Sequence, residues 1–414
     1  MNWKIKTGNF FLMQILDINK TFKEGKVILS AEIKSDCQNE PQTLFFCYPE
    51  KFGAYLPLNA DPFFPVMLIP SMLYGEDLEI LPELSAGLYN NQSVIQDIFK
   101  SWYPGKLKKI KVNAENFYRP PENLPEKNAT FFSLGVDSMY TLLKHLPENN
   151  PYPGKELNSL IYIKGLELPL STYSKGQDKD VILAIDRLAR HYGLELVTGE
   201  TNIRDVFPLD FVKLFLGPSL ASCALSLSDG FKNIFVPSHY SYADLFHVSS
   251  HPMIDGLWSN EKTRIIHDGS EKERAYKIAD LIAYDDYALD NLRVCVCNEG
   301  GNYNCCRCWK CIRTMLTLEI IGRLENSGAF KLPLPHNYST ELKSYSHDSM
   351  VYVKENWKLA KNFGRKDLEK RLYIEIRVGS LDIFRDQKSY AYLFKEIIHY
   401  ILIKLGRKLS IKSI

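Results

Sequence analysis

Three widespread motifs are missing from this chain of 414 residues. It contains no G-x-x-x-x-G-K-[ST] loop, no G-x-G-x-x-G fingerprint and no H-E-x-x-H pair. Their absence argues against P-loop kinases, dinucleotide oxidoreductases and zinc proteases, because each of those classes builds its site on one of these motifs. The chemistry of the chain has to be carried by other residues.

Long hydrophobic runs are missing as well. The most apolar stretch, residues 214–227, contains Pro218 and is shorter than the about 20 residues of a membrane-spanning helix, so we expect a buried helix there. Only a short apolar patch, residues 10–16, follows the first residues, which predicts no secretory signal peptide. We therefore expect a cytoplasmic protein without a membrane role. Its length and its 45% hydrophobic content predict two or three domains with sizeable cores.

The net charge is only +2, but it is unevenly distributed. Residues 326–414 contain 17 Lys and Arg against 9 Asp and Glu. Such a basic segment is compatible with an anionic partner, including nucleic acid. Solvated faces of ordinary surface helices explain the same excess and are the simpler interpretation.

Six of the nine cysteines lie close together, at positions 295, 297, 305, 306, 308 and 311. Cys305, Cys308 and Cys311 form a C-x2-C-x2-C run, which is metal-ligand spacing, and one upstream cysteine completes a tetrahedron. We choose Cys295 over Cys297 as the fourth ligand and expect Cys306 to point away. Four sulfur ligands predict a structural Zn²⁺ site. Coincidental thiols and a redox switch are the alternatives.

The chain divides into segments of different pattern. Residues 1–118 mix strand-like alternation with short helical patterns, which indicates an α+β accessory domain. The proline-rich stretch 119–125 marks a boundary. The apolar runs that follow, at 129–132, 159–163, 195–198 and 233–237, alternate with helical patterns, which is typical of an α/β domain whose parallel sheet has helices on both faces. We assign this domain to 119–290, the cysteine-rich segment to 291–325 and a basic helical extension to 326–414.

The first strand-to-helix junction of the α/β domain reads Ser133-Leu134-Gly135-Val136-Asp137-Ser138. Small and hydroxyl residues at a helix N-terminus offer backbone N–H groups and the positive end of the helix dipole, which together favour phosphate. Ser133 and Ser138 would add hydroxyl donors, and Asp137 would hold Mg²⁺. An N-cap with a tight glycine turn produces the same pattern without a ligand.

This run resembles the S-G-G-x-D-S loop of the PP-loop ATP pyrophosphatases. Together with the C-x2-C-x2-C run it resembles 7-cyano-7-deazaguanine synthase (QueC) within that superfamily, over about residues 128–320. The resemblance implies a Rossmann-like (HUP) sheet, the cofactors ATP, Mg²⁺ and Zn²⁺, and a substrate of the 7-deazaguanine type. It assigns the ATP phosphates to Ser133, Leu134, Gly135, Val136, Asp137 and Ser138, with Asp137 and Ser138 in catalysis.

The reaction implied by the resemblance has two stages. The substrate carboxylate attacks the α-phosphate of ATP, and ammonia then displaces AMP to give an amide, which a second ATP helps to dehydrate to the nitrile. Leu134 stands at a glycine position of the motif, so we expect its side chain to intrude where backbone should approach pyrophosphate. The N-terminal segment and the C-terminal extension are absent from the compact enzyme. The chain therefore resembles the longer QueC-like proteins, some of which occur in bacterial antiphage operons, and a partner protein that carries the nitrogen nucleophile fits the extra segments.

The loop of residues 249–259 follows a sheet strand and belongs near the sheet edge where α/β proteins bind ligands. A flat deazaguanine needs an aromatic face and a carboxylate acceptor. The candidates are Tyr242, Asp244, His251, Asp255 and Trp258. Arg274 and Lys277 lie on one helix face and would reach pyrophosphate, with Lys277 in catalysis. Packing over a core and ordinary surface charge are the alternatives for these residues.

Two other functions remain in competition at this point. One is a PP-loop enzyme that modifies tRNA by thiolation, with the basic extension as the RNA contact. The other is a binding module without catalysis, in which Leu134 has disabled the loop.

Overall fold

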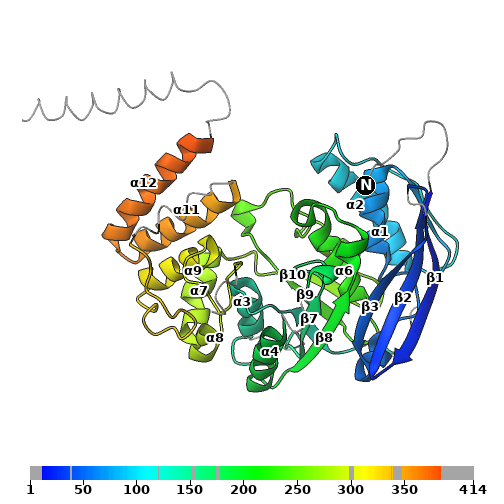
Figure 1. Cartoon of the computed structure of the whole chain (residues 1–414), viewed down its shortest axis with the longest axis horizontal. Helices are drawn as coiled ribbons and strands as arrows, with labels where there is room; N and C mark the ends of the chain where they lie inside the picture. The colour runs from blue at the N-terminus through cyan, green and yellow to red at the C-terminus, as the bar shows by residue number, and fades with distance from the viewer. Residues whose placement is uncertain are drawn as a thin grey trace, which may run out of the picture. The chain divides into compact units, whose positions relative to one another are not determined.

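The computed structural model describes residues 12–37, 40–119, 121–150, 154–173, 178–297, 303–336, 338 and 347–383. The chain forms two compact units, residues 1–272 and 273–414 (Figure 1). These bounds differ from the domains assigned from the sequence. Residues 118 and 119 both lie inside unit 1, and residues 273–290 belong to unit 2.

Unit 1 contains one sheet of ten strands in the order β10-β9-β6-β7-β8-β3-β2-β1-β4-β5. The strands are β1 Leu12–Lys23, β2 Lys26–Ser35, β3 Gln42–Pro49, β4 Asp77–Ile80, β5 Val112–Ala114, β6 Asn128–Phe131, β7 Ser159–Lys164, β8 Glu195–Thr201, β9 Asn233–Pro237 and β10 Arg264–Asp268. Strands β6 to β10 are all parallel, which confirms the predicted parallel α/β sheet. The sheet is extended by the strands of the N-terminal segment, through an antiparallel pairing of β3 with β8.

The join between the two halves of the sheet is narrow. Only Phe46 with Thr201 and Cys47 with Glu200 pair between β3 and β8. On the far side of β3, β2 and β1 continue antiparallel, and β4 and β5 then run parallel to β1. The predicted accessory domain is therefore part of the same sheet as the α/β domain.

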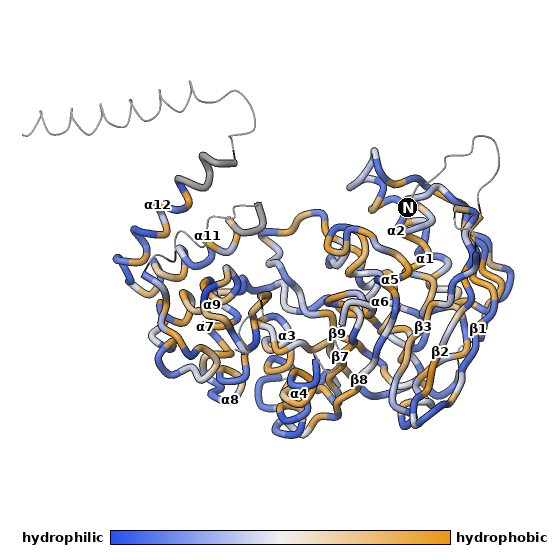
Figure 2. The backbone as a smooth tube through the Cα atoms, viewed as in Figure 1, coloured by the Kyte–Doolittle hydropathy of each residue, from blue (hydrophilic) through white to orange (hydrophobic). Residues whose placement is uncertain are grey.

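Helices cover both faces of the parallel half. The helices of unit 1 are α1 Phe64–Tyr74, α2 Ala86–Trp102, α3 Val136–Lys144, α4 Lys179–His191, α5 Ile203–Val206 and α6 Leu216–Leu225. Of these, α3 contacts β6 and β9, α4 contacts β7 and β8, and α1 contacts β4 and α6. Successive side chains of a strand point to opposite faces, and β9 shows the result. Ile234 and Val236 pack into the core that contains α1 and α6, whereas Phe235 between them lies with its ring centroid 4.3 Å from that of His145, just after α3. Figure 2 shows the hydrophobic stretches that build this core in β3, β7 and α1.

The described secondary structure of unit 2 consists of helices joined by loops. Its helices are α7 Arg274–Asp280, α8 Asp286–Asp290, α9 Trp309–Ile320, α11 His347–Asn362 and α12 Lys366–Ile383. Ile312 and Leu316 of α9 share a core with Leu359 of α11 and Leu372 of α12. Residues 384–414 of the predicted basic extension lie outside the described residues. Among the described helices, none combines the length and the apolar character that crossing a bilayer requires.

Candidate functional site

Four cysteine sulfurs meet in unit 2. The Sγ atoms of Cys295, Cys305, Cys308 and Cys311 all lie within 4.8 Å of one another. The Sγ atoms of Cys305 and Cys311 are 3.9 Å apart, and those of Cys308 and Cys295 are 4.0 Å apart. Tetrahedral Zn²⁺ with Zn–S bonds of about 2.3 Å sets its sulfurs roughly 3.8 Å apart. The donor set therefore fits zinc, as the spacing predicts.

Local structure around α9 positions these sulfurs. Cys308 is the N-cap of α9, so Cys311 falls in the first turn of that helix, and the Cys308 N–H donates to Cys305 Sγ over 3.2 Å. The hydrogen bond from Cys311 holds the pKa of Cys308 well below that of a free thiol, which favours the thiolate that binds zinc. Arg313 is buried two residues further on, with its guanidinium 3.9 Å from the ring centroid of Tyr352. Its positive charge offsets part of the thiolate charge.

One residue that supports the cluster, Asn304, was not among the predicted site residues. Its Oδ1 accepts from the backbone N–H groups of Val294 and Cys295, and its Nδ2 donates to the carbonyls of Leu292 and Ala329. The side chain is 4% exposed and has all four of these bonds, so it fixes the segment that carries Cys295 against the segment that carries the other three ligands. An Asn next to a cysteine run is a weak signal, because Asn is common in any turn.

The other two of the six neighbouring cysteines, Cys297 and Cys306, are outside the cluster. Cys306 is buried, has a φ of 56° and directs its Sγ toward the carbonyl of Asn304 at 3.5 Å. Cys297 is exposed. The structure thus groups Cys295, and not Cys297, with the other three sulfurs, and Cys306 points away from them, as expected.

In unit 1, the loop of residues 132–135 joins the end of β6 to the start of α3. The chain runs from β6 through β7 to β8 on one side, and then crosses to β9 and β10 on the other side of β6. The order of these five strands therefore reverses between β6 and β9. Open α/β sheets bind ligands at the carboxyl ends of the strands at such a reversal, which is where this loop lies.

Hydrogen bonds of Ser138 hold the loop in shape. Ser138 Oγ accepts from the Ser133 N–H over 3.3 Å and donates to the Gly135 carbonyl over 3.0 Å. Gly135 is the N-cap of α3, and no side chain caps this helix. Asp137 lies in the first helical turn and is 9% exposed, while Ser133 is exposed. The first turn of an α-helix leaves N–H groups without intrahelical partners, so this helix start is a candidate anion site.

Leu134 does not behave as expected from the sequence. It adopts φ 64°, a left-handed conformation that glycine takes without cost, but its side chain is 0% exposed. The side chain is in the protein interior and does not project into solvent above the loop. Leu134 thus combines a left-handed backbone with a buried side chain, which differs from the expected side chain above the loop, and contact of the loop with pyrophosphate stays a prediction.

Helix α3 is attached to the end of β10 through Asp268. This carboxylate accepts from Thr141 Oγ1 and Lys144 Nζ, each over 2.9 Å, and contacts His145 Nε2 at 3.2 Å. Burial alone would raise the pKa of Asp268, but the hydrogen bond from His145 and the charge of Lys144 outweigh it and hold the pKa far below its usual range. The carboxylate stays ionised and fixes the helix that follows the loop.

The predicted substrate residues separate into two groups. Trp258 is 0% exposed and packs edge-on against Phe64 in the core, so it has no free ring face and its assignment to a substrate was wrong. Tyr242 is 60% exposed, after β9, and Asp244 accepts from Ser241 Oγ. The sequence pattern could not distinguish the buried aromatic from the exposed one.

Asp255 and His251 belong to a buried polar network. Asp255 Oδ2 lies 2.7 Å from His267 Nδ1 and accepts from Ser250 Oγ, and His267 Nε2 lies 3.0 Å from Ser270 Oγ. His251 is 5% exposed, and burial lowers its pKa. The His251 N–H donates to Asp255 Oδ1, and His251 Nδ1 accepts from the Met253 N–H. These bonds shape the loop after β9, and direct contact with a substrate stays a prediction.

Arg274 and Lys277 are in unit 2, on α7. The Arg274 guanidinium lies 5.0 Å from the ring centroid of Tyr352, and Lys277 is 1% exposed. Their contact with pyrophosphate stays a prediction.

With this geometry in hand, we compared the chain with known proteins: no family model, curated protein or solved structure matched it.

Proposed function

We propose that the protein is a QueC-like, ATP-dependent ligase that adenylates a carboxylate and transfers the acyl group to a nitrogen nucleophile. One observation carries the proposal: the Ser133–Ser138 loop at the reversal point of a parallel sheet occurs in the same chain as a four-cysteine cluster that fits zinc. Either feature alone is common to many α/β proteins. Their combination supports a PP-loop enzyme of the HUP type.

The proposed roles follow from the chemistry of each group. Backbone N–H groups at the start of α3, with Ser133 and Ser138, bind the phosphates of ATP. Asp137 would hold Mg²⁺, which supplies positive charge to the phosphate oxygens. The substrate carboxylate displaces pyrophosphate from the α-phosphorus, and the nitrogen nucleophile then displaces AMP and loses a proton. The cysteine cluster, with all four positions taken by sulfur, stabilises unit 2 and takes no part in the reaction.

We further propose 7-carboxy-7-deazaguanine as the substrate and a partner protein as the source of the nucleophile. The exposed ring of Tyr242, after β9, is a candidate for stacking on the base. Intact-mass spectrometry of candidate partner proteins, incubated with the enzyme, ATP and this substrate, tests the second point. A gain of one deazaguanine mass is expected, and formation of only a free amide or nitrile from ammonia would contradict it.

The decisive experiment measures pyrophosphate release. Full-length protein with ATP and Mg²⁺ should release pyrophosphate only when 7-carboxy-7-deazaguanine is added, and Asp137→Ala should reduce the rate by about 100-fold or more. Asp180→Ala is the matched control, because Asp180 is an exposed acid in the first turn of α4. Normal turnover by Asp137→Ala would refute the phosphate-loop assignment. Release that requires tRNA in place of the carboxylate would indicate a tRNA-modifying enzyme, and no release at all would favour a binding module.

A further inference from the structure

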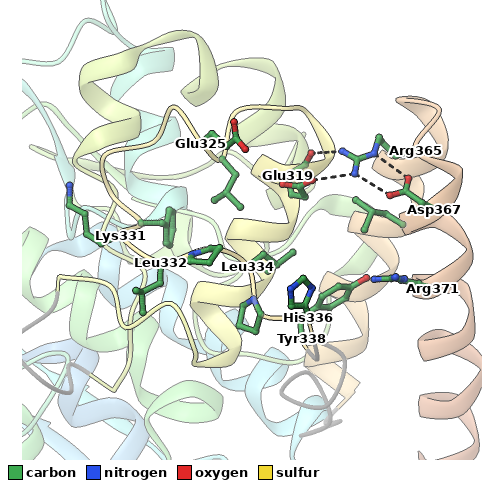
Figure 3. Close-up of a pocket in the computed structure, with 15 residues that line it drawn as sticks. Glu319, Glu325, Lys331, Leu332, Leu334, His336, Tyr338, Arg365, Asp367 and Arg371 are labelled. Atoms are coloured by element: carbon green, nitrogen blue, oxygen red, sulfur yellow. Dashed lines mark hydrogen bonds and ion pairs between the residues drawn. The ribbon is translucent and has the colours of Figure 1, made fainter.

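Unit 2 contains a cavity of about 530 Å³ that none of the residues discussed above lines (Figure 3). It lies between the C-terminal end of α9, the loop of residues 324–336 and the first turns of α12. Its volume is within the range of about 300–1,000 Å³ that small-molecule sites occupy. The four zinc ligands are not among its lining residues.

One wall of the cavity is apolar. Phe330 and Leu368 are 7% and 5% exposed, and Leu324 and Leu334 complete the wall. Leu332, also in the lining, is 44% exposed. Covering such a surface stabilises a complex by roughly 25 cal/mol for each Å² of apolar area removed from water. The wall therefore favours a ligand with a hydrocarbon body.

In a second part of the lining, the positive and negative charges are already paired with one another. Arg365 Nη2 lies 3.2 Å from Glu319 Oε1 and 3.1 Å from Asp367 Oδ2, and its Nη1 donates to the Glu319 carbonyl over 2.8 Å. Its charge is balanced by two carboxylates, as the dashed lines in Figure 3 show. This group has little left to offer a ligand.

The third part differs because its donors are not matched. Tyr338 is 4% exposed, and its hydroxyl lies beside Arg371, a guanidinium that can donate to it but cannot accept, so the phenol O–H has no acceptor within the part of the chain that the structure describes. Figure 3 shows this hydroxyl directed toward Arg371, for which no ion pair exists among the described residues. Burial raises the pKa of Tyr338, and the nearby Arg371 opposes that rise. A buried O–H donor without an acceptor costs about 1–3 kcal/mol.

We infer that this cavity binds a small-molecule carboxylate with an apolar body, whose carboxylate accepts hydrogen bonds from Tyr338 and Arg371. A planar guanidinium donates two parallel bonds to a carboxylate, and the phenol adds a third donor. Arg371 is exposed, so its charge is hydrated in the absence of a ligand, and it attracts an anionic head group and repels a cation. The hydrocarbon body covers Phe330, Leu334 and Leu368. This site is separate from the proposed ATP chemistry and does not depend on it.

Isothermal titration calorimetry on the full-length protein tests the inference, with octanoate as the probe. Octanoate should bind, and octan-1-ol and inorganic phosphate should each bind at least about 10-fold more weakly, because each lacks one of the two recognised parts. Arg371→Gln should weaken octanoate by about 10-fold or more and Tyr338→Phe by several-fold. Arg377→Gln is the matched control, because Arg377 is exposed on the same helix and does not line the cavity. It should leave the affinity unchanged.

Several results would overturn the inference. Equal binding of octanoate and octan-1-ol would show an apolar cavity without carboxylate recognition. Phosphate binding as tightly as octanoate would show an anion site without an apolar part. Absence of octanoate binding, or affinity unaltered in both Arg371→Gln and Tyr338→Phe, would contradict it as well. Because ATP is absent from these titrations, failure here leaves the proposed ligase activity untouched, and the reverse also holds.

Discussion

The cysteine cluster and the loop before α3 are built in opposite ways. The cluster presents side-chain atoms, and all four ligands come from seventeen consecutive residues. The loop presents backbone N–H groups, and its position depends on strands that pair across the whole parallel half of the sheet. One site is local and made of side chains, while the other is assembled by the fold.

This difference determines how each site responds to substitution. A side-chain site loses its function when one ligand changes, because no other group can replace a sulfur. A backbone site tolerates changes in its own side chains and is sensitive to the groups that hold its conformation. For the loop, those groups are Leu134, Ser138 and the distant Asp268.

The largest effect is expected in the cluster. Cys308→Ser should abolish binding of one zinc per chain and unfold unit 2, because closed zinc sites contribute roughly 10–16 kcal/mol of apparent binding free energy to folding. Elemental analysis and thermal unfolding measure the two losses. Cys297→Ser is the control, since Cys297 is exposed and outside the cluster. A stable Cys308→Ser protein with full zinc content would contradict the assignment.

The next largest loss of stability is expected at Asp268, which holds helix α3 behind the loop. Asp268→Asn should reduce the free energy of unfolding by about 1.5–3 kcal/mol, because it removes the ionised acceptor of Thr141, Lys144 and the buried His145, while Lys144 keeps Glu271 as a partner. Since the pKa of Asp268 is lowered by folding, its stabilisation is present above the ordinary Asp pKa of about 4 and is lost as the pH falls below it. Urea unfolding at pH 5 and pH 3 should therefore show a smaller pH dependence in the variant than in the parent protein.

Glu271→Gln is the matched control for this experiment. Glu271 also pairs with Lys144, but its side chain is 40% exposed. Removing an exposed pair costs no more than about 1 kcal/mol. If both variants lost the same stability, Asp268 would not be the anchor.

An intermediate effect is expected at Leu134, and two substitutions separate its causes. Leu134→Gly relieves roughly 1–2 kcal/mol of left-handed strain but gives up a buried side chain worth about 2–5 kcal/mol, so stability should fall. Leu134→Ala gives up nearly the same burial and keeps the strain, so it should be the less stable of the two. The rate of pyrophosphate release per folded molecule should be maintained or raised in Leu134→Gly. Chemical denaturation measures the stability of the two variants, and activity assays measure the rate of pyrophosphate release. If Leu134→Ala were more stable than Leu134→Gly, the left-handed conformation would not be strained.

The smallest effect is expected at Cys306. Cys306→Ser should change the free energy of unfolding by less than about 1 kcal/mol and leave the zinc content intact, because a serine hydroxyl can donate to the same Asn304 carbonyl. Loss of zinc from this variant would place Cys306 among the ligands and break the contrast drawn above.

The local site was the more predictable of the two from the sequence. Spacing and residue type identified all four sulfurs, because the ligands are close in the chain and few other residues bind zinc through sulfur. Asn304 was missed because its role depends on carbonyls at Leu292 and Ala329, which no spacing rule connects. The strands β6 to β9 were also recognisable as short apolar runs in the sequence.

The features that could not be predicted from the sequence depend on contacts between residues far apart in the chain. The proline-rich stretch after residue 118 suggested a domain boundary, yet the strands before it join the same sheet through two residue pairs between β3 and β8. A contact of that size leaves no periodic signal in the sequence. Trp258 was misassigned for a similar reason, since a loop pattern does not reveal which aromatic faces the core. The ATP, Mg²⁺ and ligase assignments stay predictions.

The narrow join between β3 and β8 also has a consequence during synthesis. At about 5–20 residues per second, β8 leaves the ribosome roughly 8–30 s after β3. During that interval the nascent N-terminal half has an unpaired strand edge at β3, which includes the apolar run Leu44, Phe45 and Phe46. Open apolar edges invite pairing with other chains. Newly made protein should therefore depend on chaperones until β8 is added, and a fragment that stops before residue 195 should aggregate.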